Sequence, residues 1–463
     1  MNVRVAMVAG VLAAALSGVG LLAQEDGRGH EPQSVGEVLP GFWRGAYVLG
    51  ESVQPVTLTI TREGDAWRAL PRVPEWPGVL METRDVDVDA DGRLSLDMPW
   101  GRATLRLDLE RRELVGRVGE DPTLGLHLKR MLRPPPQAWT RELIEVEGLA
   151  GTLSGTVVRP RLQPAPWPGI VWITGRGCWD GASDSQVRRA QLLAEHGVAS
   201  LVVEKRGTGR SGGDCATATH DDLVADALAA LDAARAQAGF DPERVGLQGS
   251  SAGGWIAVAA AAAAEPPPAF VVTVVGPSTS VEQQQRDNAR LIARDLGLSG
   301  DDLAAVDRYQ DLMFDASVEP AAAFAEMRAL LEHARETGWI AYHEETDIPT
   351  SADAMDALWV RRFAYDPADD LRAWQGPLLA ILGGRDRVVP SLSNKRLYER
   401  LFAEAGNERG RVRILPLASH GMWIPEGPST REDGTESYGF ERLAAGLLEE
   451  VLVFLEDNEL LDV

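Results

Sequence analysis

The strongest constraint on the fold is a Gly-rich stretch near the middle of the 463-residue chain. Gly249, Ser251 and Gly253 form one G-x-S-x-G pattern, with the apolar run 245–247 before it and the Ala-rich run 255–264 after it. Strand, sharp turn and helix in this order hold a serine hydroxyl above the edge of a sheet. The flanking residues are glycines because such a turn leaves almost no room for side chains. The alternative interpretation is a plain Gly/Ser turn of an α/β protein.

The length of the chain and its charge limit the kind of protein it encodes. A chain of 463 residues is long enough for two or three domains. Lys and Arg number 46 against 69 Asp and Glu, which gives a net charge of −23. This excess of negative charge argues against a nucleic acid or an anionic membrane as the partner. We therefore expect a partner of another chemical class.

The N-terminal segment has the pattern of a signal for export. Arg4 precedes a stretch that is apolar from residue 5 to residue 23, apart from Ser17. This pattern predicts a signal peptide over residues 1–23 and a periplasmic or extracellular protein. The apolar stretch is nearly long enough to cross a bilayer, so an uncleaved membrane anchor stays open as an alternative.

The pattern of residues 41–132 predicts a small all-β accessory domain. Runs such as 56–60 and 103–109 are apolar at every second position, as in half-buried antiparallel strands. We expect a barrel or a sandwich, either a binding module or a domain that packs beside the active site. Residues 24–40 are expected to be a flexible lead-in, and residues 133–140, with three consecutive prolines, a stiff linker.

From residue 141 to the C-terminus, buried apolar runs alternate with helical patterns. This alternation predicts a doubly wound, mostly parallel sheet. The strands are expected at 169–174, 199–203, 245–248, 271–275, 377–382 and 411–415, after a hairpin of 143–146 and 153–158, and the last helix at 439–455. Residues 281–370 contain no strand pattern and predict a helical cap over the sheet edge. Capping boxes are expected at Thr219–Asp222 and Ser299–Asp302.

Two further residues complete the chemistry that Ser251 requires. A serine becomes a nucleophile when a base accepts its proton and a carboxylate orients that base. Asp386 follows the strand 377–382, and His420 follows the strand 411–415. His420 is the one histidine of seven that comes after both Ser251 and Asp386. Nucleophile, acid and base thus occur in the order typical of a Ser-Asp-His triad on a parallel sheet. Taken singly, Asp386 and His420 also fit ordinary loop positions.

An oxyanion hole needs two backbone N–H donors near the nucleophile. We expect one from Ala252, directly after the serine. The other should come from the loop after the strand 169–174, with Arg176 preferred and Gly177 next. The Gly-rich loop 204–213 carries three cations but no phosphate-binding fingerprint, so we interpret it as structural, with Glu204 bonded to loop backbone.

The two cysteines, Cys178 and Cys215, fall in loops after strands that are expected to be neighbours. In an exported protein this pair could form one disulfide, and two free thiols are the alternative. Neither cysteine has His or Cys partners at metal-ligand spacing, so no metal is predicted. The proposed chemistry requires no organic cofactor either.

With these motifs in view, residues 141–463 resemble bacterial secreted α/β-hydrolases of the serine aminopeptidase-like and prolyl oligopeptidase-like group, related to dienelactone hydrolases. The matching segments are 175–180, 205–212, 241–254, 383–390 and 419–421. The resemblance implies an α/β-hydrolase fold and acyl transfer through a serine, and does not indicate a substrate. Thr174 stands where relatives usually carry His, and Glu204 stands where they usually carry Asp.

The sequence therefore predicts an exported serine hydrolase that cleaves an ester through Ser251, His420 and Asp386. A peptidase with the same triad, aminopeptidase-like or oligopeptidase-like, is the first alternative. A non-catalytic binding protein on a hydrolase scaffold is the second. Fold alone does not separate these functions.

Overall fold

The computed structural model describes residues 34–462, with gaps at 51, 74–82, 90, 99–100, 121–123, 135, 150, 182, 338–347, 425–428, 431–435 and 438–441. Of residues 429–430 and 436–437 it describes the backbone alone. The predicted signal peptide and residues 24–33 of the predicted lead-in lie outside the described residues.

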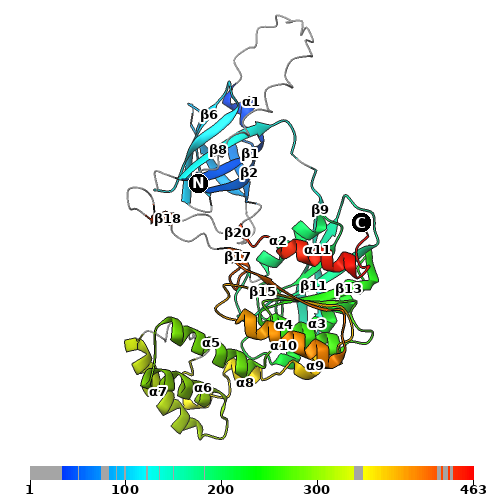
Figure 1. The fold of residues 1–463 in the computed structure, drawn as a ribbon. Helices are drawn as coiled ribbons and strands as arrows, with labels where there is room; N and C mark the ends of the chain where they lie inside the picture. The colour runs from blue at the N-terminus through cyan, green and yellow to red at the C-terminus, as the bar shows by residue number, and fades with distance from the viewer. Residues whose placement is uncertain are drawn as a thin grey trace, which may run out of the picture.

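The N-terminal domain is a closed barrel of eight antiparallel strands, in which β1 pairs with both β2 and β8 (Figure 1). This confirms the predicted all-β domain and selects the barrel over the sandwich. Its interior is apolar because every second residue points inward, as the burial pattern of β2 shows. The strands are β1 Gly41–Leu49, β2 Ser52–Glu63, β3 Ala66–Arg72, β4 Arg84–Val88, β5 Arg93–Met98, β6 Gly101–Asp108, β7 Glu113–Val118 and β8 Leu124–Met131.

The expected flexible lead-in is wrong for its last residues. Residues Val35–Val38 form a short helix, α1, which is closed by reciprocal hydrogen bonds between Ser34 and Glu37. Val38 and Leu39 are buried in the barrel core, and Trp43 donates its indole N–H to Leu39 O at 3.0 Å. Burial of these side chains orders the segment where polarity alone predicted flexibility.

The second domain is built on an eight-stranded sheet in the order β16-β15-β14-β13-β11-β12-β10-β9. Six strands are parallel, and the hairpin β9–β10 adds an antiparallel edge. The predicted mostly parallel sheet is thus confirmed. Its strands are β9 Trp139–Gly148, β10 Gly151–Pro160, β11 Trp167–Ile173, β12 Ala199–Val203, β13 Phe240–Ser250, β14 Val271–Val274, β15 Leu378–Gly383 and β16 Gly410–Leu415.

Helices cover both faces of this sheet (Figure 1). The helices α3 His220–Arg235, α4 Ala252–Ala263 and α10 Ser391–Ala405 pack on one face, and α2 Asp184–Ala194 and α11 Leu447–Asp457 on the other. Neighbouring residues of β11 belong to opposite cores, Val171 to the first and Trp172 to the second. A strand buried on both faces therefore reads as a continuous apolar run.

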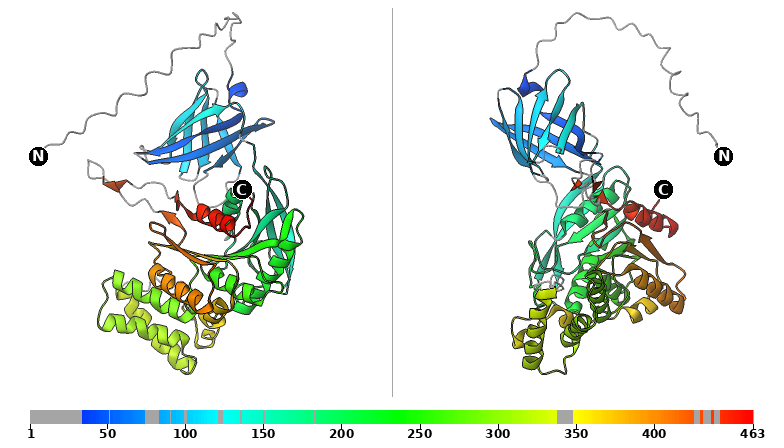
Figure 2. Two further views of the ribbon diagram at one scale, coloured as in Figure 1. Left: turned by 45° about the vertical axis from the view of Figure 1, so that its right-hand side comes forward. Right: turned by 60° about the vertical axis from the view of Figure 1, so that its left-hand side comes forward.

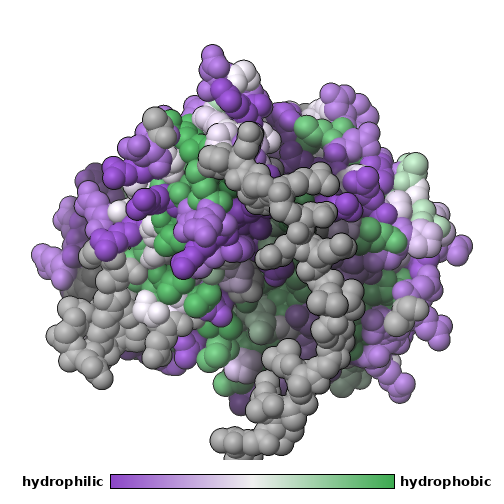
Figure 3. All heavy atoms as spheres, turned by 90° about the horizontal axis from the view of Figure 1, so that it is seen from above, coloured by the Kyte–Doolittle hydropathy of each residue, from purple (hydrophilic) through white to green (hydrophobic). Residues whose placement is uncertain are grey.

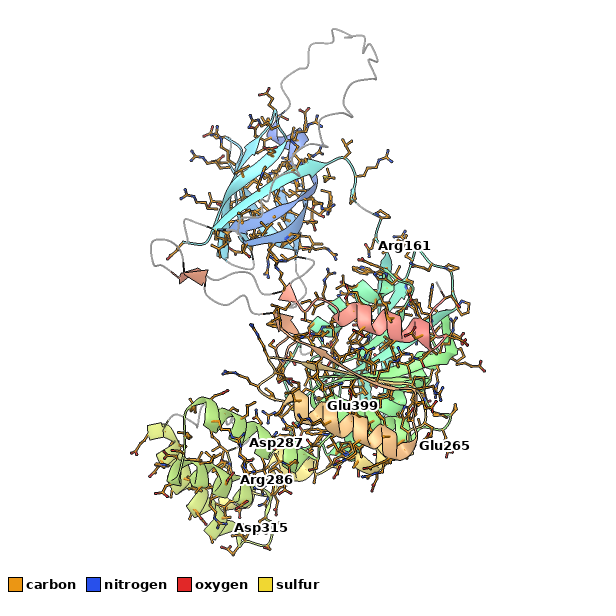
Figure 4. All side chains as sticks on the ribbon, viewed as in Figure 1. Arg161, Glu265, Arg286, Asp287, Asp315 and Glu399 are labelled. Carbon is orange, nitrogen blue, oxygen red and sulfur yellow. A yellow bond between two sulfur atoms is a disulfide. The ribbon has the colours of Figure 1, made fainter. Side chains whose placement is uncertain are left out.

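The cap follows β14 and consists of helices, as predicted. Its members are α5 Val281–Asp295, α6 Asp301–Phe314, α7 Pro320–Thr337, the 3-10 turn η3 Ala352–Ala354, α8 Trp359–Arg362 and α9 Ala368–Ala373. The side chains of Arg286, Asp287 and Asp315 are labelled on it in Figure 4. Arg286 bridges two cap helices, with Glu282 on its own helix and Asp311 on α6.

Two predicted helix starts are corrected. The predicted capping box at Ser299 is absent because Gly300, at φ 57°, is the N-cap of α6 and has no side chain to offer. The predicted box at Thr219 is present, since Thr219 accepts from Asp222 N. The last helix starts at Leu447 and not at residue 439, because Arg442–Leu443 form the short strand β20 paired with β17, Trp423–Ile424. Ser429–Thr430 and Glu436–Ser437 form a second such pair, β18 and β19.

The barrel and the cap lie at opposite ends of the second domain (Figure 2). Seen from the barrel end, hydrophilic and hydrophobic residues are intermixed on the surface (Figure 3). Arg442 donates to Val53 O of the barrel at 3.0 Å, and Arg72 of the barrel lies over the Trp139 ring.

A buried histidine, His220 of α3, packs against aromatic residues of the cap. Its burial predicts that the protein is less stable in acid. His220 stacks on Tyr365, with ring centroids 4.1 Å apart, and meets Phe363 edge-on. Burial lowers the pKa of His220, although Asp221 and Asp370 act in the opposite direction. Below about pH 6.5 the unfolded chain then binds a proton that the folded chain does not, so acid lowers the free energy of unfolding in this window.

We expect His220→Phe to reduce this loss of stability between pH 7.5 and pH 5.5, as measured by urea unfolding. The variant keeps an aromatic ring against Tyr365 but cannot bind a proton. His196→Phe, at an exposed position, is the matched control and should keep the wild-type dependence. Parallel pH curves for wild type and His220→Phe would contradict this prediction.

Candidate active site

The backbone at Ser251 has a conformation that is rare for a residue with a side chain. Ser251 lies between the last residue of β13 and the first residue of α4, at φ 54° and ψ −125°. Non-glycine residues seldom occupy this region, and doing so costs on the order of 1–3 kcal/mol. The turn is held by Ser251 N, which donates to Val274 O at 2.9 Å, and by Gly254 N, which donates to Ser251 O at 2.8 Å.

The two flanking glycines are required by close backbone approach. A Cβ at Gly249 would lie 1.9 Å from Gly253 O. A Cβ at Gly253 would lie 2.6 Å from Ile173 O and 2.7 Å from Thr174 O. Any side chain would therefore push the helix away from the sheet, as the G-x-S-x-G pattern suggested.

The side chains of Ser251, His420 and Asp386 lie in one hydrogen-bonded chain. His420 Nε2 is 3.0 Å from Ser251 Oγ, and His420 Nδ1 is 2.9 Å from Asp386 Oδ2. The Asp386 carboxylate is fully buried and its other oxygen accepts from Val388 N and Val389 N, at 2.7 and 2.9 Å. This arrangement fixes the carboxylate and directs one imidazole nitrogen at the hydroxyl, so it can move a proton from Ser251 to His420.

The loop after β11 passes directly against Ser251. A Cβ at Gly175 would lie 3.2 Å from Ser251 Cβ. On the other side, Ala252 N belongs to the first turn of α4 and has no carbonyl one turn earlier to bond. Both features suit an oxyanion hole, and donation by Ala252, Arg176 or Gly177 stays a prediction.

Three ties fasten this loop to the loop after β12. A disulfide joins Cys178 to Cys215. Asp180 accepts from Gly209 N at 2.6 Å. Lys205 Nζ donates to Gly175 O and to Gly177 O, the latter at 3.0 Å. The sequence interpretation of 204–213 as a structural loop fits these contacts, although it did not identify Lys205 as the anchor.

Glu204 and Lys205 have different tasks in this loop. Glu204 accepts from Arg210 N at 2.7 Å, which confirms the predicted bond to loop backbone. Lys205 is partly buried, and this burial lowers its pKa to about 8. Because an ammonium in such a place costs free energy, its bonds to the two carbonyls are the compensation.

Ser251 and His420 open into a cavity of about 510 Å³ between the sheet and the cap. This volume is typical of a pocket for a small ligand. Its walls include Trp179, Gln186 and Arg189 from the α2 side, Gln284, Gln285, Asn288 and Trp359 from the cap, and Arg387 and Trp423 from the loops of Asp386 and His420. Gln284 and Asn288 of α5 also donate to Val388 O and Arg387 O, at 2.8 and 2.6 Å. The sequence patterns did not identify these residues of the cavity wall.

The one weak sequence signal for these wall residues lies in α2. Gln186 and Arg189 are buried on a helix whose other buried positions include Val187, Ala190 and Leu193. A long polar side chain beside an apolar stripe is common on helix surfaces, so this signal alone could not be distinguished from a solvated position.

A comparison with protein families identifies the group to which this fold and site correspond. A model described as X-Pro dipeptidyl-peptidase (S15 family) matches residues 151–422, more than half of the chain. The chain belongs to the S15 family. The match covers β10 through the loop of His420, including the whole cap, and excludes the barrel. No curated protein matches the chain.

Solved structures similar to this S15-family chain include esterases. An esterase of Pyrococcus furiosus is 14% identical, with 69% of this chain and 92% of that chain covered and a TM-score of 0.42. Carboxyl esterase 2 of Tuber melanosporum is also 14% identical, with 71% and 87% covered and a TM-score of 0.40. An esterase of Pyrobaculum calidifontis is 18% identical, with 59% and 75% covered and a TM-score of 0.35.

Two other kinds of functional feature are absent from the described residues of this S15-family chain. Within the described residues, no group of three or more His, Cys, Asp or Glu side chains could hold a metal ion. No helix in the same part of the chain has both the length and the apolar character needed to cross a bilayer.

The anchoring by Lys205 leads to a kinetic prediction. Lys205→Met keeps the length of the side chain but removes both hydrogen bonds to the 175–177 loop. We expect kcat on an ester to fall about 10- to 100-fold, since misplacing an oxyanion donor weakens transition-state binding more than substrate binding. Lys395→Met, at a partly exposed lysine of α10, is the control and should leave kcat unchanged. Equal kcat values for both variants would show that Lys205 does not position the loop.

Proposed function

We propose that this chain is a serine hydrolase that cleaves carboxylic esters by acyl transfer. The observation that supports this most directly is the hydrogen-bonded chain from Ser251 through His420 to the buried Asp386 carboxylate, at the wall of a cavity. Membership of the S15 family supports hydrolase chemistry in general.

In the proposed mechanism Ser251 Oγ attacks the carbonyl carbon of the ester while His420 Nε2 takes the hydroxyl proton. Asp386 holds the imidazole and stabilises its charged form. The N–H groups of Ala252 and Arg176 would hold the oxyanion of the tetrahedral intermediate. When the intermediate collapses, the C–O bond breaks and His420 gives its proton to the departing alcohol. Water, deprotonated by His420, then releases the acid and restores Ser251.

The second candidate is a peptidase with the same triad, and the name of the family favours it. A peptidase that trims dipeptides must bind a free N-terminal ammonium, for which a carboxylate is the usual partner. Among the described residues that line the cavity there is no Asp or Glu. This is why we place the ester first.

Labelling with a fluorophosphonate probe tests the nucleophile. Wild type should be labelled, and Ser251→Ala should not be labelled and should lose at least about 10³-fold in kcat on 4-nitrophenyl butyrate. Ser250→Ala is the matched control, because this neighbouring hydroxyl is buried and has no hydrogen-bond partner in the described structure. A folded wild type without labelling would support the non-catalytic binding protein.

Parallel assays with 4-nitrophenyl esters and aminoacyl-prolyl 4-nitroanilides separate the two enzymatic candidates. We expect ester turnover with kcat/KM at least about 100-fold above that for the anilides, since no described residue of the cavity lining offers a carboxylate to their ammonium. Efficient turnover of the anilides would establish the peptidase instead.

We also propose that the protein works outside the cytoplasm. The disulfide Cys178–Cys215 supports this, because such bonds persist in oxidising compartments, and so does the pattern of residues 1–23. Replacing both cysteines by serine should lower the free energy of unfolding by about 2–4 kcal/mol in chemical denaturation. The N-terminal sequence of the mature protein would show whether residues 1–23 are removed.

A further inference from the structure

A buried arginine at the wall of the cavity, Arg189, has no acidic partner among the described residues. Arg189 is 8% exposed and lines the cavity together with Ser251 and His420. Its Nη2 donates to Gly421 O at 2.9 Å, and its Nε has no partner in the described structure. Burying a cation without a counter-charge costs free energy, and binding of an anion next to it would recover part of that cost.

Arg206 shows what a fully compensated buried arginine looks like in the same domain. Its guanidinium bonds both oxygens of Asp226, at 2.7 and 2.8 Å, and its Nη1 lies 2.9 Å from Asp222. The hydrogen bond to Asp226 contributes most to a raised pKa of Arg206, whereas burial lowers the pKa of Arg189 to about 10. Arg189 therefore stays charged at neutral pH and remains uncompensated.

A second unpartnered donor lies beside Arg189. The indole Nε1 of Trp423 is buried, has no hydrogen-bond partner among the described residues, and lines the same cavity. Both donors lie next to Gly421. Arg189 donates to Gly421 O, and a Cβ added to Gly421 would lie 3.0 Å from Trp423 Nε1. Each of these two buried N–H groups lacks an acceptor, and an anion bound at this part of the wall would supply one.

The other charged side chains that line the cavity are also positive. Two other arginines line it, Arg176 over the Trp359 ring and Arg387 at 3.4 Å from Asp295. No described lining residue is acidic, although the whole chain carries a net charge of −23. A positive cavity in an acidic protein focuses the field that attracts an anionic group.

We propose that Arg189 and Trp423 form an anion subsite, and that the natural substrate is an ester that also carries a carboxylate. This inference rests on the proposed function. Gly421, which both side chains approach, directly follows His420 in the chain. A substrate whose carboxylate binds there would have its ester carbonyl held toward Ser251.

A purely structural role does not account for Arg189. Its bond to Gly421 O helps to hold the loop of His420, but this uses one of the five N–H groups of a guanidinium. A neutral donor could make the same bond without the cost of burying a charge. The charge therefore needs a separate explanation, and a negatively charged substrate provides one.

Substrates matched in shape but not in charge test the proposal. On the acyl side, the mono-4-nitrophenyl ester of adipic acid is compared with its methyl ester and with 4-nitrophenyl 6-aminohexanoate. On the alcohol side, 3-acetoxybenzoate is compared with its methyl ester. We expect wild type to prefer the carboxylate over the methyl ester by at least about tenfold in kcat/KM in one of the two series, and to disfavour the amine. The series that shows the preference locates the carboxylate on the acyl or the alcohol side.

Three variants assign the preference to the subsite. Arg189→Gln should abolish the preference, measured as the ratio of kcat/KM for the carboxylate to kcat/KM for the methyl ester in the same variant, and Arg189→Lys should retain part of it because the charge remains. Trp423→Phe, which keeps the ring and removes the N–H, should reduce it. Arg188→Gln, at the neighbouring arginine of α2 outside the cavity lining, is the matched control and should keep it.

The outcomes separate this inference from the proposed function. Labelling by the fluorophosphonate together with turnover of the neutral ester, but no preference for the carboxylate, would overturn the anion subsite and leave the hydrolase intact. A preference that survives in Arg189→Gln would overturn it as well. If the Arg189 variants do not fold, inhibition of the wild type by adipate but not by dimethyl adipate supports the subsite, and equal inhibition refutes it.

Discussion

The active site depends on a single strained backbone position. Ser251 is held at φ 54° because β13 ends and α4 begins on either side of it, and because Gly249 and Gly253 let the helix approach the sheet to within contact of carbonyl oxygens. The free energy that this conformation costs is offset by the packing of α4 in the apolar core on one face of the sheet. The hydroxyl, the first N–H of the helix and the position of the cavity all follow from that one turn.

The structure treats its charged groups near the site in two opposite ways. Arg206 and Asp386 are buried and hydrogen-bonded within the protein, so they hold their loops in place and are not available to bind a ligand. Lys205 is partly buried, and its partners are the neutral carbonyls of the loop beside Ser251. Arg189, at the cavity wall, has no acidic partner among the described residues. The charged groups that have partners therefore hold the loops around the site in place. The charge that lacks a described partner lies at the wall where a substrate would bind.

The sequence predicted those parts of the fold that local periodicity controls. Continuous apolar runs identified the parallel strands, alternating runs identified the barrel strands, and the order of the motifs placed Ser251, Asp386 and His420 at the ends of β13, β15 and β16. What the sequence could not predict depends on contacts between distant segments. The order in α1 depends on burial of Leu39, and the role of Lys205 depends on carbonyls some thirty residues earlier. A role for Arg189 could not be inferred from the sequence, because the lack of a described carboxylate near it is evident only in the fold.

The first cap helix, α5, is bonded to the loop that carries the Asp386 carboxylate. Gln284 and Asn288 donate to the carbonyls of Val388 and Arg387, while Val388 N donates to Asp386. One wall of the cavity and the carboxylate that holds the His420 imidazole are therefore connected by direct hydrogen bonds. Remodelling of α5 would have to preserve these two amides, or it would alter the orientation of His420 together with the shape of the cavity.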